Sequence, residues 1–158
     1  MPKDSAPTRS AILDAAVHTL KRAGLEGFTV EGVSRRAGVV KGLVLYHYGS
    51  RNRLLRAAAA EIAADRAARL RAALGEGAGA AAVDACWAEL RRQAEDGTAR
   101  AWLGLCSAGI IDRAGAQQGW EETARQALLD GCATALAAGT PLADVRDSYH
   151  ALWLALID

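Results

Sequence analysis

The sequence predicts an all-α protein, in which a small N-terminal three-helix domain is joined by a connecting helix to a larger helical bundle. Alanine is abundant among the 158 residues, prolines number three, and aromatic residues make up 5% of the chain. This composition favours closely packed helices. Apolar residues recur at intervals of three and four, the period of an amphipathic helix. A strand over residues 39–48 would lack a pairing partner, because no second strand-like run occurs in the sequence.

The first two helices are expected over residues 8–23 and 30–37. Both stretches place apolar residues on one face at three-to-four spacing. Thr8 is a candidate N-cap and Gly24 a candidate terminator of the first helix. Thr29 can cap the second helix with its hydroxyl group.

Gly38 is expected to form the turn between helix 30–37 and a second short helix over residues 40–47. Small Ser34 before the glycine and apolar Val44 after it are the residue types needed where two helices cross steeply. This is the layout of a helix-turn-helix, whose second helix enters the major groove of DNA. Two ordinary core helices could share the same three residues, so the spacing alone leaves both interpretations open.

A connecting helix is expected to begin near Ser50, whose hydroxyl can cap it, and to continue through Leu70. The small-residue run GEGAGAAA then predicts a linker. Four apolar-faced helices that can bury one core as a bundle are expected to follow, at about residues 83–96, 99–113, 117–138 and 142–158. We therefore expect a first domain over residues 8–52 and a second over residues 53–158.

Charge divides the chain into a basic and an acidic half. Residues 1–71 contain 13 Lys and Arg against 6 Asp and Glu, whereas residues 72–158 contain 6 against 12. A basic half is suited to a polyanionic partner, although an unevenly charged solvated surface would give the same count. The N-terminus lacks an apolar signal core and no apolar run approaches the roughly 20 residues that cross a bilayer, so a cytoplasmic location without a membrane partner is expected.

Residues with chemical potential are sparse in the second half. Cys86, Cys106 and Cys132 form no CxxC pair and have no neighbouring histidine, so buried free thiols are expected, with no metal site and no cofactor. Each of the last four helices contains one tryptophan. These rings could line one ligand cavity, or they could fill a core otherwise made of small residues. The candidate pocket residues are Trp87, Trp102, Cys106, Trp120, Tyr149 and Trp153.

The run from Ser10 to Leu55 resembles the N-terminal DNA-binding domain of the TetR family of transcriptional regulators. The stretches AILDAAVHTLKRAG, FTVEGVSRRAGVVKG and LYHYGSRNRLL carry the resemblance, because three helices and both connecting segments match in order and length. The resemblance implies that the second helix of the motif reads base edges, while Arg51 binds a phosphate. The candidate DNA-contacting residues are Thr29, Lys41, Gly42, Leu43, Tyr46, His47 and Arg51.

Several positions depart from the family pattern. Val40 stands where a Ser or Thr usually opens the recognition helix, so this helix is expected to fray in the absence of DNA. Leu43 and Leu45 lack the hydroxyl groups often found there, which favours contact with thymine methyl groups and readout of DNA shape. Glu31 stands where some members of the family have a basic or polar residue that contacts a DNA groove, so that role is not expected of it. Tyr46 would alternatively be a packed aromatic residue.

The second half is also similar, over a shorter stretch, to the choline-responsive branch of that family. The segments AWLGLCSAGI and ALWLALID carry this similarity. It implies a small-molecule effector, apolar or cationic, and the tryptophan rings would form a cage if the effector were a quaternary ammonium. The identity of the effector stays open.

The chain ends at ALWLALID, inside an apolar helix, where proteins of this resemblance continue, so a truncated chain is expected. In the family the last helices pair two subunits. Palindromic operators require such a pair, because two recognition helices must lie roughly 34 Å apart. The candidate dimer surface is helix 142–158, with Leu152, Leu156 and Ile157.

These observations together predict a homodimeric transcriptional regulator rather than an enzyme. It is expected to act as a repressor that a small-molecule effector releases from double-stranded operator DNA. The main alternative is an all-helical small-molecule-binding protein or enzyme that uses a cysteine or histidine in the tryptophan-lined cavity, although no catalytic motif supports it. A third alternative is an architectural DNA-binding protein without an effector. The operator, the regulated genes and the sign of regulation stay open.

Overall fold

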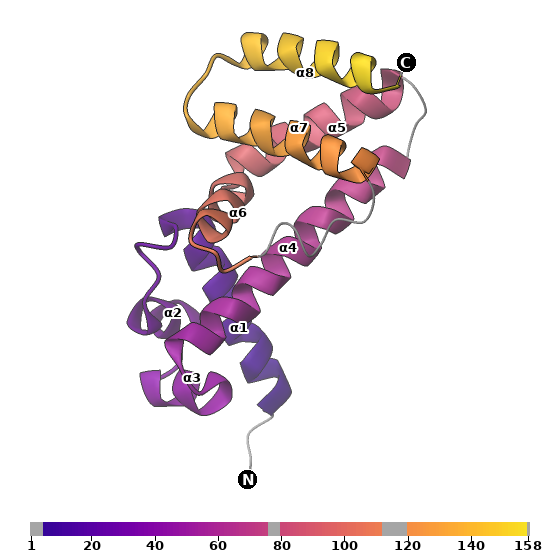
Figure 1. The fold of residues 1–158 in the computed structure, drawn as a ribbon. Coiled ribbons are helices and arrows are strands. Elements are labelled where there is room, and N and C mark those ends of the chain that lie inside the picture. The colour runs from indigo at the N-terminus through magenta and orange to yellow at the C-terminus, as the bar shows by residue number, and fades with distance from the viewer. Residues whose placement is uncertain (1–4, 76–79, 112–119, 158) are drawn as a thin grey trace.

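The computed structural model describes residues 5–75, 80–111 and 120–157, and over these ranges the chain is helical with short connections (Figure 1). At residues 5, 74, 75, 80–83, 120–128 and 152–157 only the backbone is described. Within these ranges no helix is long and apolar enough to cross a bilayer. The helices are α1 (Ser5–Ala23), α2 (Val30–Ala37), α3 (Lys41–Tyr48), α4 (Arg51–Gly75), α5 (Ala80–Glu95), α6 (Thr98–Ser107), α7 (Trp120–Ala137) and α8 (Leu142–Ile157).

The first of two cores lies between α1, α2, α3 and the N-terminal part of α4. Its side chains come from the apolar faces that the periodicity predicts, and α6 adds Ala101 and Leu105 to them. The largest fully buried members are Ile12, Leu20, Phe28, Val33, Val44, Leu54, Ile62 and Leu105. The first core therefore extends past the predicted domain boundary at residue 52 and includes a helix of the second half.

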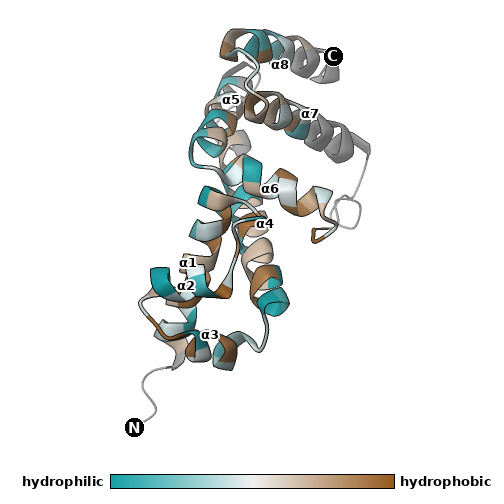
Figure 2. Cartoon of the chain, turned by 90° about the vertical axis from the view of Figure 1, so that its left-hand side faces the viewer, coloured by the Kyte–Doolittle hydropathy of each residue, from teal (hydrophilic) through white to brown (hydrophobic). Residues whose placement is uncertain are grey.

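The second core lies between the C-terminal part of α4 and helices α5, α7 and α8. Its buried side chains include Leu70, Cys86, Leu90, Leu129, Val145 and Tyr149. Figures 1 and 2 both place α3 at one end of the molecule and α8 at the other. The long helix α4 connects the two cores, as the connecting helix of the sequence prediction should.

Helix α6 joins the two parts at the C-terminal end of α1. Arg100 donates hydrogen bonds from Nη2 to the carbonyl oxygens of Lys21, at 3.0 Å, and Arg22, at 3.2 Å. Gly97, just before α6, has φ 83°, and a Cβ atom there would lie 2.2 Å from the Lys21 carbonyl oxygen. Only glycine combines this backbone conformation with so close an approach, so Gly97 fixes how closely α6 meets α1.

Three predicted helix ends are confirmed. The Thr29 hydroxyl accepts a hydrogen bond from the Gly32 amide at 3.0 Å and caps α2. The Ser50 hydroxyl accepts one from the Arg53 amide at 3.2 Å at the start of α4. The Gly24 amide donates to the Leu20 carbonyl at 2.9 Å where α1 ends.

Other predicted ends are wrong. Helix α1 begins at Ser5, so Thr8 lies inside the helix and is not its N-cap. The helix predicted over residues 99–113 ends at Ser107, because Gly109 adopts φ 66° and the chain turns so that Ile110 and Ile111 pack against the first core. The predicted linker is shorter than residues 75–82, since α4 reaches Gly75 and α5 begins at Ala80.

Candidate nucleic-acid interface

Helix α3 is anchored to the rest of the N-terminal helices by one face. Val44 and Tyr48 are buried on that face, as the spacing predicts, and Ser34 of α2 is buried near the crossing. The Tyr48 hydroxyl donates a hydrogen bond to the Arg9 carbonyl of α1 at 2.9 Å. Burial raises the pKa of the Tyr48 hydroxyl above its ordinary value, so the group stays a neutral donor. This anchoring leaves the opposite face of α3 available to a partner.

The free face of α3 carries an aromatic pair. Tyr46 is 80% exposed and His47 is partly buried beside it, with their ring centroids 5.3 Å apart in an edge-to-face arrangement. Leu45, which the sequence also offered for contact with thymine methyl groups, is 36% exposed next to them, and Leu43 is half-buried. By the period of the helix Tyr46 lies opposite the buried Val44 and Tyr48, whereas Leu45 lies on the flank of the exposed face.

The N-terminal turn of α3 has an open surface. Gly42 is exposed, and a Cβ atom there would meet nothing within 4 Å. Val40 precedes the helix, is 74% exposed and offers no side-chain hydrogen bond to it. The predicted lack of a cap is therefore confirmed, and the backbone of this turn is accessible to a ligand.

Lys41 does not extend freely into solvent. Its ammonium group forms an ion pair with Glu31 across the turn between α2 and α3. The hydrogen bond from Lys41 holds the pKa of the Glu31 carboxyl below its ordinary value. Both groups are exposed, so solvent screens the pair and Lys41 can exchange Glu31 for a phosphate or a guanine. Sequence spacing gave no signal for this pair, because its members lie ten positions apart on two helices.

Arg51 has a structural role that the sequence did not reveal. Its Nε group donates a hydrogen bond to the Phe28 carbonyl at 3.1 Å, and its guanidinium lies 5.5 Å from the centroid of the Phe28 ring. No other hydrogen bond to this guanidinium is found among the described residues, so its terminal amino groups remain available to a phosphate. The Thr29 hydroxyl likewise accepts a hydrogen bond from within α2, which it caps. Thr29 is nevertheless exposed at the surface.

The predicted pocket residues divide between two environments. Trp87 and Tyr149 are buried in the second core, with ring centroids 5.6 Å apart. Trp102 is buried elsewhere and donates from Nε1 to Asp130 at 3.2 Å. Cys106 is partly buried. The side chains of Trp120 and Trp153 lie outside the described residues, as do those of Leu152, Leu156 and Ile157, so a shared cavity and the dimer surface stay predictions.

Asp130 is the centre of a buried polar group that spacing in the sequence does not indicate. Arg66 of α4 donates to its Oδ1 atom at 2.9 Å, and the Arg66 guanidinium lies 4.8 Å from the centroid of the Trp102 ring. Arg66 is 3% exposed and Asp130 is 6% exposed. This group ties α4, α6 and α7 together.

The buried thiols and the hydroxyl of the second core are not activated. Burial raises the pKa of Cys132 to about 11 and raises that of Cys86, so both thiols are protonated at neutral pH. Burial also raises the pKa of Tyr149 well above its ordinary value. Within the part of the chain that the structure describes, no cluster of His, Cys, Asp or Glu has the arrangement of a metal site.

Residues 12–58 match the family described as "Bacterial regulatory proteins, tetR family". A curated relative, the HTH-type transcriptional regulator BetI of Paraburkholderia phytofirmans (strain DSM 17436 / LMG 22146 / PsJN), is 37% identical over 49 residues. The matched segment covers 31% of this chain and spans a quarter of the length of that relative.

Solved structures share the fold over nearly the whole chain. A TetR-family transcriptional regulator from Rhodococcus sp. has a TM-score of 0.59 at 23% identity, covering 97% of this chain and all of its own. A gamma-butyrolactone receptor, described as an ArpA-like protein, has a TM-score of 0.59 at 20% identity, with 98% and 88% coverage. The multidrug binding protein EbrR, solved with imidazole, has a TM-score of 0.55 at 21% identity, with 96% and 93% coverage.

Proposed function

We propose that this chain, as a member of the tetR family of bacterial regulatory proteins, binds operator DNA sequence-specifically and so regulates transcription. Its residues 12–58 match that family. One observation carries the proposal: α3 buries Val44 and Tyr48 and turns Tyr46 and His47 outward beside the open backbone at Gly42. An α-helix presented in this way fits the major groove.

The side chains of the interface have distinct roles in this proposal. Tyr46 and His47 contact base edges or the adjacent backbone, while Leu43 and Leu45 pack on thymine methyl groups. Lys41 leaves Glu31 for DNA, and Arg51 binds a phosphate through the terminal amino groups that Phe28 does not engage.

The remaining parts of the proposal concern regulation. We place the DNA-binding domain at residues 8–52 and a ligand-binding and dimerisation domain at residues 53–158, with helix α8 in the dimer interface. The fold shared with a gamma-butyrolactone receptor and a multidrug binding protein supports a small-molecule effector in the second domain. The effector would favour one of two orientations of the DNA-binding domains and so lower affinity for the operator, which is the action of a repressor.

A mobility-shift titration of the full chain against the DNA upstream of its own gene tests DNA binding. We expect a specific complex whose affinity falls steeply with salt, because phosphate contacts release counterions. Absent binding, or binding insensitive to salt, would contradict the proposal.

The double variant Tyr46→Ala/His47→Ala tests the assignment of α3. We expect loss of discrimination between operator and unrelated DNA, by about tenfold or more, since each good base contact contributes on the order of 1–3 kcal/mol. Arg91→Ala, at an exposed residue of α5, is the control and should keep operator discrimination. Circular dichroism should show the wild-type helix content in both variants, and unchanged operator preference in the double variant would refute the assignment.

A further inference from the structure

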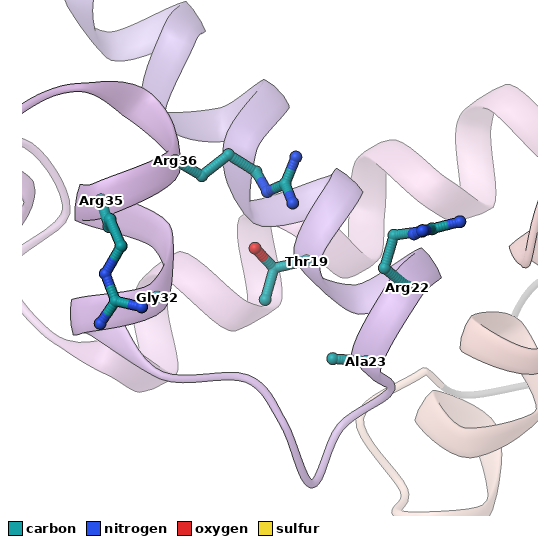
Figure 3. A pocket seen from close by; sticks show the side chains of 6 residues that line it. All are labelled: Thr19, Arg22, Ala23, Gly32, Arg35 and Arg36. Atoms are coloured by element: carbon teal, nitrogen blue, oxygen red, sulfur yellow. The ribbon is translucent and has the colours of Figure 1, made fainter.

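A second cationic site lies between α1 and α2, away from the face of α3 described above. It is a hollow of about 470 Å³, here called the arginine hollow. Figure 3 shows Arg36 extending from the end of α2 toward α1, Arg35 beside Gly32, and Arg22 on the facing turn of α1. The hollow is lined by Thr19, Arg22, Ala23, Gly32, Arg35 and Arg36.

The arginine hollow lacks a compensating negative charge. Among the described residues no carboxylate forms an ion pair with any of its three arginines, and Arg36 instead contacts Nε2 of His18 at 3.3 Å. Two acidic residues near the hollow have other partners, because Glu31 pairs with Lys41 and Asp65 pairs with Lys21. Glu26, in the connection between α1 and α2, is exposed and forms no ion pair with these arginines among the described residues. The charge of the hollow is therefore available to a ligand.

The fold explains how three arginines gather here without acidic partners. They lie at the C-terminal ends of α1 and α2, where the negative end of each helix dipole stabilises positive charge. Thr19 is uncharged and donates its hydroxyl hydrogen to the Ala15 carbonyl at 2.8 Å. Gly32 adds no side chain to the lining, and a Cβ atom there would lie 3.1 Å from the Thr29 hydroxyl.

We propose that the arginine hollow binds a small molecule that carries a phosphate group. Arginine forks match the oxygen geometry of phosphate, and exposed arginine side chains can turn toward a bound anion. A hollow of this volume is within the range of small-molecule sites.

The position of the arginine hollow favours a diffusible molecule over the DNA backbone as the source of that phosphate. Arg22 and Lys21 accept hydrogen bonds from Arg100 of α6 through their carbonyl oxygens. The hollow thus borders the contact between α1 and α6, whereas α3 lies at the opposite side of α2 (Figure 1). Arg22 takes part in both, because it lines the hollow and its carbonyl oxygen accepts a hydrogen bond from Arg100 of α6.

Calorimetric titration of the full chain with sodium pyrophosphate, at constant ionic strength, tests the site directly. We expect saturable binding to the wild type and binding about tenfold or more weaker to Arg35→Gln/Arg36→Gln, because charge-assisted hydrogen bonds are lost. Arg91→Gln, which removes an exposed arginine of α5, is the matched control and should bind like the wild type. No saturable binding to the wild type, or equal binding to the double variant, would overturn the proposal.

Two further measurements distinguish a small-molecule site from a loss of folding and from a contact with DNA. The double variant should melt at the wild-type temperature, because both arginines are exposed. If its melting temperature is lower, Arg22→Gln takes its place in the same titration, and it should also bind pyrophosphate about tenfold or more weakly than the wild type. If the double variant lowers the slope of log affinity for DNA against log salt by about one or more, the arginines contact DNA phosphates and the assignment to a small molecule is wrong. The calorimetry contains no DNA, so its result is independent of operator binding.

Discussion

Asp130 shows how strongly a single buried residue can determine the stability of this molecule. Its carboxylate receives hydrogen bonds from Arg66 and Trp102, and the Arg66 guanidinium also lies over the Trp102 ring. Burying two charges is costly, and their mutual contact offsets that cost. Removing only one member leaves the other charge buried without this contact.

We expect Asp130→Ala to lower the free energy of unfolding by about 3–5 kcal/mol, because Arg66 remains buried without this carboxylate. Urea denaturation followed by circular dichroism measures the change. Asp147→Ala, at an exposed residue of α8, is the control and should stay within about 0.5 kcal/mol of the wild type. Arg66→Met/Asp130→Leu should be more stable than Asp130→Ala, and the opposite order would contradict a charge-based cause.

Glu89 gives the stability a dependence on pH. Burial works to raise the pKa of this carboxyl, but the hydrogen bonds from Gln93 and Arg92 and the charge of Arg69 outweigh it, so the pKa lies below the ordinary value of 4.5. A lowered pKa in the folded state contributes stability above the unfolded value, and this stability is lost as the pH falls through the folded value.

The wild type should therefore lose stability on acidification below about pH 4.5, and Glu89→Gln should lose less over the same interval. Melting temperatures measured across that interval provide the check. Glu95→Gln, which removes an exposed carboxylate of the same helix, should follow the wild-type profile. Parallel profiles for the wild type and Glu89→Gln would show that Glu89 does not cause the dependence.

At the scale of the element, α3 has no side-chain cap, and α6 is preceded by a glycine whose replacement would strain the chain. Val40 gives no side-chain hydrogen bond to the first amides of α3. Gly97 brings the start of α6 against the Lys21 carbonyl. Each feature makes a separate prediction about its helix.

Val40→Ser should stabilise α3 by about 0.5–1 kcal/mol, because the new hydroxyl can accept a hydrogen bond from the first turn. Slower hydrogen exchange of the Gly42 and Leu43 amides would report this effect. Val40→Ala loses the same exposed apolar surface without gaining an oxygen, so it should not slow exchange. Equal exchange in both variants would mean that the first turn is held by other contacts.

Gly97→Ala should destabilise the chain by at least about 2 kcal/mol, because alanine disfavours positive φ and its Cβ atom would overlap the Lys21 carbonyl. Gly104→Ala, inside α6 with nothing within 4 Å of an added Cβ atom, is the matched control. It should be neutral or raise stability by up to about 1 kcal/mol through helix propensity. Thermal melts distinguish the two, and a tolerated Gly97→Ala would show that α6 can shift away from α1.

The order and number of helices in the described ranges follow from the sequence because apolar periodicity is a local signal. Helix ends were less predictable: Thr8 has the chemistry of a cap, yet the chain enters α1 earlier, at Ser5. The turn at Gly109 depends on Ile110 and Ile111 reaching a core built by distant helices. Local residue preferences carry no information about such contacts.

The exposed face of α3 was predictable from the sequence, but the ion pairs of the structure were not. The exposed face of α3 follows from burial of Val44 and Tyr48 at helical spacing. The pairing of Lys41 with Glu31 depends on the angle between two helices, and the pairing of Arg66 with Asp130 joins residues 64 positions apart. Spacing in the sequence cannot reveal partners that only the tertiary fold brings together.

At the scale of the whole molecule, the boundaries of packing differ from the boundaries of charge. The basic half of the sequence ends near residue 71, but the first core ends within α4 near Ile62 and then recruits Ala101 and Leu105 from α6. The N-terminal helices therefore complete their core only with a segment from the second half.

That shared core limits how this protein could be recombined with its relatives. A chimera that grafts α1 to α4 onto the C-terminal half of a protein of the same fold would lack the side chains of Ala101 and Leu105, unless that protein supplies equivalents at the same places. The missing side chains would leave a cavity in the first core near the contact between α6 and α1 that Arg100 makes. A transplant that carries α6 together with the first four helices would keep its native packing, so the exchangeable unit of this protein is discontinuous in sequence.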